Sequence, residues 1–229
     1  MATLANLIRL FLLGTIIAQS TAQNNGNTNI SIEIGFQTSE LDRMNILRQE
    51  SDWTFDFLSQ PNYTYNPGSV LNADSTTFPA TVGNGLTMAW VSLGPCAMQP
   101  PHYHPRASNY IASVAGENVT TYMIPENGGR LFTNSIWPGK MTLFPKGSLH
   151  AMQNTGCGNA TIVSALNSED PGTHTIANAL FFLPKDIIYA ALGQNPDTKN
   201  LDTFADLIPA VGSGITNGSA ECRKRCGII

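Results

Sequence analysis

The sequence predicts an all-β protein built as an antiparallel sandwich or barrel. Short apolar or alternating runs, separated by Pro, Gly and Asn, follow one another between Val70 and Leu183. They cover residues 86–93, 111–114, 119–124, 131–137, 141–144, 160–166 and 176–182. With 229 residues, 42% of them hydrophobic and 12% charged, the chain has enough apolar material for one such core and no compositional extreme. We therefore expect a single domain with extensions.

Residues 1–22 have the pattern of a signal peptide. One positive charge, Arg9, precedes an apolar run from 10 to 18, and Ser20 and Ala22 fit the small-residue rule for cleavage after Ala22. The run is short for a membrane-spanning helix, which is the alternative. We expect a secreted protein without a membrane anchor after cleavage. Loss of Arg9 changes the net charge from −4 to −5.

Residues 23–60 are expected to form an N-terminal arm ahead of the barrel, which is assigned to 61–184. Residues 23–30 are polar and Asn-rich, and apolar residues at helical spacing predict one or two turns of helix within 38–50. A half-buried strand is predicted next, because aromatic residues alternate with polar ones at Trp53, Phe55 and Phe57.

Residues 185–229 are expected to form a helical tail. An amphipathic helix is predicted from Lys185 to Leu192, between Pro184 and Gly193, and a second one within 201–207. Such helices cover an open edge of the barrel or dock against a partner subunit.

Five N-x-S/T sequons lie behind the signal peptide, which predicts surface loops that carry N-linked glycans. Their asparagines are Asn29, Asn62, Asn118, Asn159 and Asn217. The basic residues are scattered apart from a short cluster at 223–225, so nothing in the chain indicates a nucleic-acid partner.

The four cysteines predict two disulfides, with three possible connectivities. They are Cys96, Cys157, Cys222 and Cys226. A structural zinc site is disfavoured, because the C-x3-C pair at 222 and 226 has neither a second close pair nor an adjacent histidine.

Three of the four histidines lie beside turns in the β-rich region. His102 and His104 are two residues apart, so on a strand both imidazoles face the same side. His150 follows a turn that contains Pro145 and Gly147. This is a metal-ligand arrangement, although a pair of histidines on one strand face is also compatible with a polar surface. The fourth, His174, has the pattern of a solvent-facing loop residue.

The residues around these histidines closely resemble the two motifs of germin-like and spherulin-like cupins. The first motif, a glycine, H-x-H-P-R-A-[ST]-E and a later glycine, is matched from Gly94 to Gly116 except at one position. The second, G-x5-P-x-G-x2-H-x3-N, is matched completely from Gly139 to Asn154. Further segments, from ELDRMNIL near the start to the terminal CRKRCGI, resemble fungal and slime-mould spherulin-like cupins. The resemblance implies a cupin double-stranded β-helix, a jelly-roll barrel that holds a divalent metal.

The resemblance also implies the ligands. His102, His104 and His150 match the family's three imidazoles, while Asn109 stands where the family has a glutamate. The family's metal is manganese; a neutral amide should weaken Mn²⁺ binding and favour ions that imidazole suits, such as copper, zinc, nickel or iron. Glu117, a strand's length away, is not expected to replace the missing carboxylate. The alternative is a degenerate site that binds no metal.

The disulfides are predicted to join Cys96 to Cys157 and Cys222 to Cys226. A barrel that brings His104 and His150 to one metal also brings together the neighbourhoods of Cys96 and Cys157, and the remaining pair can close a small local ring. The barrel wall is expected to contain Met98, Trp90, Leu143, Phe144 and Met152.

Germin-like relatives include oxalate oxidases and manganese superoxide dismutases, so the resemblance implies an extracellular metal-dependent oxidoreductase that acts on a small organic molecule. Those two reactions are disfavoured by Asn109, because both rely on the carboxylate to stabilise the oxidised metal. The competing hypothesis is a non-catalytic wall or spore-coat protein. The family's habit also implies a homo-oligomer. No catalytic residue beyond the ligands can be assigned from the sequence.

Overall fold

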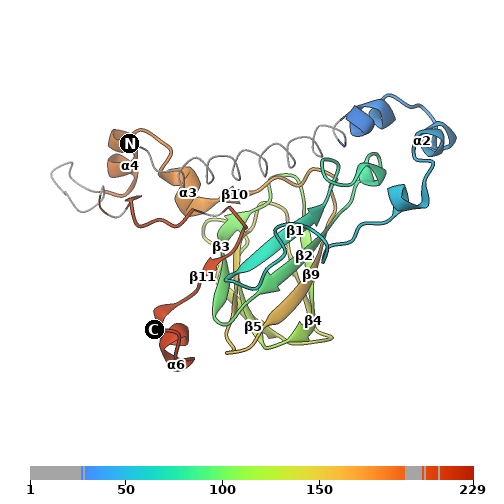
Figure 1. The fold of residues 1–229 in the computed structure, drawn as a ribbon. Helices are drawn as coiled ribbons and strands as arrows, with labels where there is room; N and C mark the ends of the chain where they lie inside the picture. Colours follow the sequence, from blue (N-terminus) through green and yellow to red (C-terminus); the bar gives the residue numbers. More distant parts are fainter. Residues whose placement is uncertain (1–26, 28, 194–202, 204, 211) are drawn as a thin grey trace, which may run out of the picture.

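The computed structural model describes residues 27, 29–193, 203, 205–210 and 212–229, and its core is a barrel of two antiparallel sheets (Figure 1). One sheet has the strand order β1-β2-β9-β4-β7, and the other has the order β10-β3-β8-β5-β6, with β11 also paired to β3. The bounds are β1 Gly68–Ala73, β2 Thr87–Leu93, β3 Ala97–Tyr103, β4 Asn109–Gly116, β5 Val119–Ile124, β6 Phe132–Ile136, β7 Met141–Phe144, β8 Leu149–Asn154, β9 Ala160–Leu166, β10 His174–Thr175 and β11 Thr216–Asn217. The predicted all-β fold is confirmed.

The barrel closes around one apolar core. Alternate residues of each strand point inward, so that Leu93 of β2 packs in one cluster with Val119 of β5 and Met152 of β8, which belong to the opposite sheet. Burying each such side chain stabilises the fold by roughly 1.5–3 kcal/mol. The alternation of apolar and polar residues in the sequence therefore predicts correctly which side chains face the inside of the barrel.

The helices of the N-terminal arm lie beyond one end of β1 and β2, and the segment that follows them returns to the barrel (Figure 1). Residues 29–35 are helical, and α2 (Glu40–Ile46) and η1 (Glu50–Trp53) confirm the helical turns predicted within 38–50. The predicted strand over Trp53–Phe57 is wrong. Asp56 accepts the N–H groups of Leu58 and Ser59, which makes a turn, and Phe57 instead stacks on Trp90 of β2 with ring centroids 6.1 Å apart.

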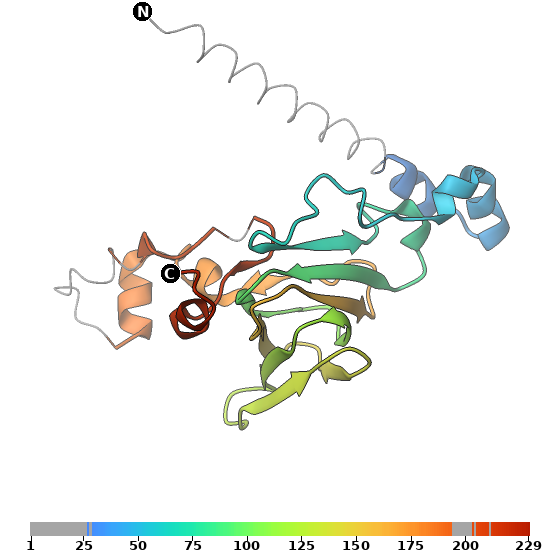
Figure 2. The ribbon, with the colours of Figure 1, turned by 60° about the horizontal axis from the view of Figure 1, so that its bottom comes forward.

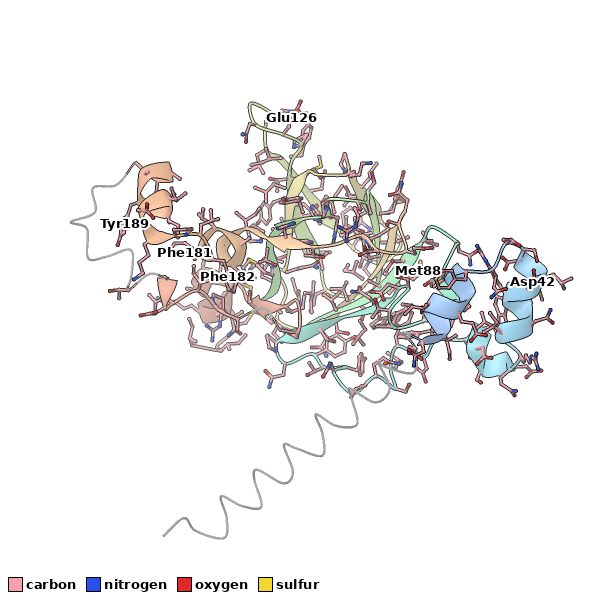
Figure 3. All side chains as sticks on the ribbon, turned by 90° about the horizontal axis from the view of Figure 1, so that it is seen from above. Asp42, Met88, Glu126, Phe181, Phe182 and Tyr189 are labelled. Atoms are coloured by element: carbon pink, nitrogen blue, oxygen red, sulfur yellow. A yellow bond between two sulfur atoms is a disulfide. The ribbon has the colours of Figure 1, made fainter. Side chains whose placement is uncertain are left out.

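The C-terminal helices project from the opposite side of the barrel, where Figure 3 labels Phe181, Phe182 and Tyr189, far from Asp42 on α2. α4 (Lys185–Ala191) confirms the predicted helix at 185–192. The strand predicted at 176–182 is wrong: pairing with β3 ends at Thr175, and the alanine-rich residues that follow form α3 (Ile176–Leu180). The helix predicted at 201–207 lies partly outside the described residues; of those described, Thr203 and Ala205 are helical, and Asp206 and Leu207 form a turn.

A C-terminal strap, residues 212–219, joins the two sheets along one side of the barrel. The N–H of Val70 on β1 donates to the carbonyl of Ser213 at 2.9 Å, and β11 pairs with the beginning of β3. Ile215 is buried in the main core. The strap then leads into α6 (Ala220–Arg225), which lies beside the barrel in Figure 2.

The disulfides differ from the predicted pairing: Cys96 is bonded to Cys222, and Cys157 to Cys226. The neighbourhoods of Cys96 and Cys157 do meet, as predicted, because the Cys96 N–H donates to the Gly156 carbonyl. However, Cys222 and Cys226 lie one turn apart on the same face of a helix, so both sulfurs face the barrel instead of each other. Cys222 therefore bonds to Cys96 and Cys226 bonds to Cys157, and the two bridges attach α6 to the barrel.

All five sequon asparagines are exposed. The predicted signal peptide, residues 1–22, lies outside the described residues. Among the residues that the structure describes, no helix is both long enough and apolar enough to span a bilayer.

Candidate metal centre

His102, His104 and His150 converge inside one end of the barrel. His102 is near the end of β3 directly opposite His150 on β8, and His104 follows β3 immediately. One ring nitrogen of each histidine lies within 4.8 Å of a ring nitrogen of the other two. The three side chains are only 1%, 7% and 3% exposed in that order, so this is an interior cluster and not a polar surface.

The outer nitrogen of each ring is held by a backbone carbonyl. Nδ1 lies 2.7 Å from the Pro100 oxygen in His102, 2.7 Å from the Gly172 oxygen in His104, and 2.9 Å from the Ser148 oxygen in His150. A carbonyl only accepts, so Nδ1 carries the proton in all three rings. Each Nε2 is therefore left with a lone pair that points into the cluster.

These inward nitrogens are the strongest indication of a metal. Nε2 of His102 and of His150 is buried and has no hydrogen-bond partner among the described residues. Buried polar atoms are nearly always paired, so two buried acceptors side by side without a hydrogen-bond donor fit a cation that both could bind. Outer-nitrogen hydrogen bonds to carbonyls are also the usual support of metal-bound histidines. The residues present therefore fit a divalent cation.

Burial keeps the three imidazoles neutral. Loss of hydration, followed by repulsion from His104, lowers the pKa of His102 to about 4. Loss of hydration also lowers the pKa of His150 and His104, and for His150 the charge of His102 adds to the effect. Metals bind the neutral ring, so at neutral pH the cluster is already in its binding form.

Asn109 is the fourth member of the cluster. It begins β4 and is buried; Oδ1 accepts a 2.5 Å hydrogen bond from the Ser164 hydroxyl, and Nδ2 lies 3.4 Å from Nε2 of His104. Rotation of the amide by half a turn exchanges its two ends, and a hydroxyl can donate to Oδ1 or accept from Nδ2. The residue can thus offer either an N–H or a carbonyl oxygen to the space between the histidines.

Phe144 and the core close the inner side of the site. The Phe144 ring stacks on His150 with centroids 4.2 Å apart and planes 16° apart. The Ser148 hydroxyl donates to the Pro145 carbonyl at 2.6 Å and so fixes the turn before β8. Gly147 in this turn has a φ of +79° and donates its N–H to the His104 carbonyl at 3.1 Å. The turn that positions one ligand is therefore bonded to the backbone of another.

A cavity of about 310 Å³ opens beside His102. Its walls come from β1, β3, β10 with the residue before it, and the C-terminal strap. Its polar side chains include Asn72, Gln99, Thr173 and Thr175. The Gln99 Oε1 atom is buried without a partner among the described residues. A larger hollow of about 560 Å³ lies between the N-terminal arm and β1, away from the histidines.

The other candidates lie elsewhere. His174 is exposed and stacks on Tyr103, which agrees with its predicted solvent-facing role. Glu117 packs against Gly156 and Gly158 at the other end of the barrel. Sequence reasoning missed Ser164 and the loop carbonyl of Gly172. Ser164 had a signal, because it is a polar residue among inward positions of β9 that are otherwise apolar, namely Ala160, Ile162 and Leu166; Gly172 had none.

Comparisons with known proteins agree with this geometry. The cupin family model matches residues 55–199. Spherulin-1A of Physarum polycephalum is 34% identical over 193 residues, which cover 82% of this chain and 75% of that protein. Germin-like protein 1-3 of Oryza sativa subsp. japonica is 37% identical over 147 residues, 62% of this chain and 65% of that protein. A solved oxalate oxidase in complex with the substrate analogue glycolate shares the fold with a TM-score of 0.60 at 24% identity, covering 72% of this chain and 87% of that one.

Proposed function

Because the chain belongs to the cupin family, in its germin-like and spherulin branch, we propose that it is a secreted metal-dependent oxidoreductase acting on a small organic molecule. The observation that carries the proposal is the set of three buried imidazoles whose Nε2 lone pairs point at one another. His102, His104 and His150 would hold the ion, with Asn109 as the fourth ligand through its carbonyl oxygen. A divalent ion bound there would supply Lewis acidity and a route for electron transfer.

The chain itself excludes water and orients the substrate. The cavity beside His102 is bounded by Val70 and Pro100, which are apolar, and by amide and hydroxyl side chains that can fix a small polar molecule. No Lys or Arg is among the described residues that line it. A substrate anion is therefore matched by the charge of the ion and not by the protein.

Asn109 determines the substrate class. Four neutral ligands leave the ion with its full positive charge, which disfavours a trivalent state and favours a substrate that brings its own anionic oxygen. Enol, phenol and carboxylate substrates have this property. For the same reason oxalate oxidase and superoxide dismutase activities should be low, and copper, zinc, nickel or iron should compete well with manganese.

The competing candidate is a non-catalytic wall or spore-coat protein. The loss of the family's carboxylate at Asn109 favours it, since a site kept only for stability has no need to stabilise an oxidised metal. Metal analysis of protein purified from its own host, followed by oxidation assays of the metal-replete protein, separates the two. The double variant His102→Ala with His104→Ala should lose both metal and turnover while its circular dichroism spectrum stays that of a folded β-protein. Full activity in that variant would refute the metal-dependent mechanism.

Secretion and glycosylation belong to the same proposal. Two disulfides suit an oxidising compartment, and the exposed sequon asparagines Asn29, Asn62, Asn118, Asn159 and Asn217 can accept glycans. Asn118, Asn159 and Asn217 lie at the end of the barrel opposite the histidines, so glycans there leave the cavity open. A mass shift on treatment with an N-glycosidase tests occupancy.

We also propose that two copies pair through the outer apolar face, the outward residues of β4, β7 and β9. These are Tyr110, Ala112, Val114, Met141, Leu143, Val163 and Ala165. The face has no charged residue, so it can meet a copy of itself without repulsion, and Tyr110 and Met141 are among its exposed side chains.

Sedimentation of wild type and Leu143→Lys tests this pairing. The variant places like charges opposite each other and should shift the protein to monomer. Thr133→Lys, on exposed β6 of the other sheet, is the matched control. A wild-type monomer, or equal effects of the two lysines, would refute the pairing.

A further inference from the structure

The four cysteines gather at the end of the barrel opposite the histidines. Cys96 precedes β3 and His102 lies near its end, six residues away, which separates the two sites by about 20 Å along the strand. At this end the two disulfides touch: Sγ of Cys96 lies 3.6 Å from Sγ of Cys226, an atom of the other bridge. The sulfurs of Cys96, Cys222 and Cys226 all lie within 4.8 Å of one another.

We propose that the two bridges form a thiol–disulfide exchange relay in which Cys226 carries reduction from the outer bridge to the inner bridge. The outer bridge is Cys157–Cys226 and the inner bridge is Cys96–Cys222. The relay needs no metal and does not depend on the function proposed above.

Access to the two bridges is unequal. Cys157 is exposed and Cys226 is half-buried, whereas Cys96 and Cys222 are 0% and 3% exposed. An external thiol therefore reaches the outer bridge and is kept from the inner one, because exchange requires a thiolate to contact a disulfide sulfur. Only a sulfur already inside the cluster can attack the inner bridge while α6 remains folded.

The exchange balances with an external dithiol as the reductant. One thiolate of the dithiol attacks Sγ of Cys157, the Cys157–Cys226 bond breaks, and Cys226 leaves as a thiolate. The second thiol closes the oxidised reductant and releases Cys157, so two electrons have passed to the protein. The Cys226 thiolate then attacks Sγ of Cys96, a Cys96–Cys226 bond forms, and Cys222 leaves as a thiolate and takes a proton from water.

The surroundings of Cys222 suit a leaving group. An Nη2 atom of Arg225 lies 3.4 Å from its Sγ, and this cation stabilises the departing thiolate. Once protonated, the thiol faces the carbonyl oxygens of Asn154 and Thr155 at 3.9 and 3.8 Å. The released sulfur is therefore not left without a polar contact.

The relay controls the C-terminal strap. The Gly218 N–H donates to the Cys96 carbonyl at 2.8 Å, and at its other end the strap contributes Gly212, Ser213 and Gly214 to the wall of the cavity beside His102. Reduction of the Cys96–Cys226 bond by a second dithiol, at half-buried Cys226, leaves all four cysteines as thiols. The strap is then held without a cross-link, by β11 pairing, Ile215 and the hydrogen bonds of Val70, Gly218 and Ser219. Reduction at one end of the barrel should thus loosen a wall of the cavity at the other.

The first test compares the inner bridge in the whole protein with and without the outer one. Folded wild type and the double variant Cys157→Ser with Cys226→Ser are treated with dithiothreitol under native conditions, alkylated at intervals and mapped by mass spectrometry. Removing the relay sulfur should protect the inner bridge, so that Cys96–Cys222 is reduced about tenfold more slowly in the variant. Equal or faster reduction in a variant with wild-type circular dichroism would overturn the relay.

The second test uses Cys157→Ser, which leaves Cys226 as a free thiolate source beside the inner bridge. We expect non-reducing peptide maps to contain both Cys96–Cys222 and Cys96–Cys226 species that interconvert with rising pH. Cys226→Ser is the matched control, because its free Cys157 lies outside the close sulfur group and should give Cys96–Cys222 alone. A Cys157→Ser protein with only Cys96–Cys222 and an unexchanging Cys226 thiol would reject the relay even if that variant is less stable.

Discussion

Replacing Asn109 by glutamate should strengthen metal binding and weaken the metal-free fold. Asn109 begins β4 with its amide 3.4 Å from Nε2 of His104, so a side chain one methylene longer brings a carboxylate to the ligand space. Between a divalent ion and a carboxylate about 4 Å apart, an effective dielectric constant near 20 gives roughly 8 kcal/mol of attraction. Burying the carboxylate costs several kcal/mol of hydration.

The difference leaves a net gain of about 1–3 kcal/mol, or roughly a 5- to 150-fold lower Kd for Mn²⁺. Without metal, the new carboxylate faces three acceptor nitrogens and receives no hydrogen bond from them. In the presence of a chelator, the unfolding temperature of the variant should therefore fall below that of wild type. The two effects have opposite signs and therefore cannot both come from a general change in packing.

Calorimetric titration with Mn²⁺ at fixed pH, together with thermal unfolding in the presence and absence of a chelator, measures both effects. Asn109→Gln is the matched control, because it has the length of glutamate and no charge. It should leave Mn²⁺ affinity near that of wild type. An unchanged Kd in Asn109→Glu, or an equal gain in Asn109→Gln, would show that residue 109 does not contribute charge to the ion.

Three further predictions concern the supports of the site. Ser164→Ala removes the hydroxyl that holds the buried Asn109 amide and should lower the free energy of unfolding by about 1–3 kcal/mol in urea titrations; no change would mean that the amide finds another partner. Phe144→Ala opens a void beside His150 and should cost about 3–5 kcal/mol and weaken Zn²⁺ binding, whereas Phe144→Leu should recover most of both. Metal-free protein should lose stability as the pH falls from about 6.5 towards 4, because the unfolded state protonates His102 in this window and the folded state, with its pKa lowered to about 4, does not. Neutral His102 contributes about 3 kcal/mol to the free energy of unfolding, and this contribution is fully present above pH 6.5. It should vanish from urea titrations of His102→Gln. An equal pH dependence in that variant would refute the prediction.

The barrel and its histidines were predictable because each rests on a short-range pattern. Alternation determines which residues face inward. The two-residue spacing of His102 and His104 places both imidazoles on the same side even if the predicted strand ends are wrong by a residue or two. The strand predicted at 176–182 failed because an apolar run does not show which strand it pairs with, and the next β3 residues in register, Pro101 and Pro100, have no N–H to donate. Apolar content alone did not separate a strand from a short helix.

The disulfide pairing could not be predicted for a related reason. The sequence predicted that Cys96 and Cys157 lie at the same end of the barrel, and the structure agrees. The sequence did not show that α6 crosses that end. Once helical geometry places Cys222 and Cys226 on one face, the local ring is replaced by two long-range bridges. Connectivity was decided by where a six-residue helix docks, which depends on tertiary contacts.

The hydrogen bonds at Nδ1 differ among the three histidines in how far along the sequence the accepting carbonyl lies. His102 and His150 are oriented by carbonyls two residues earlier in the chain, whereas His104 depends on Gly172, 68 residues later. The loop that carries Gly172 is tied to the barrel by Arg106, which pairs with Asp170 at 2.6 Å. A surface ion pair thus helps to orient a buried ligand, and opening of this one loop would leave a two-histidine site in which His104 is free to turn. An ion bound as proposed above would then be released by loop opening, without unfolding of the barrel.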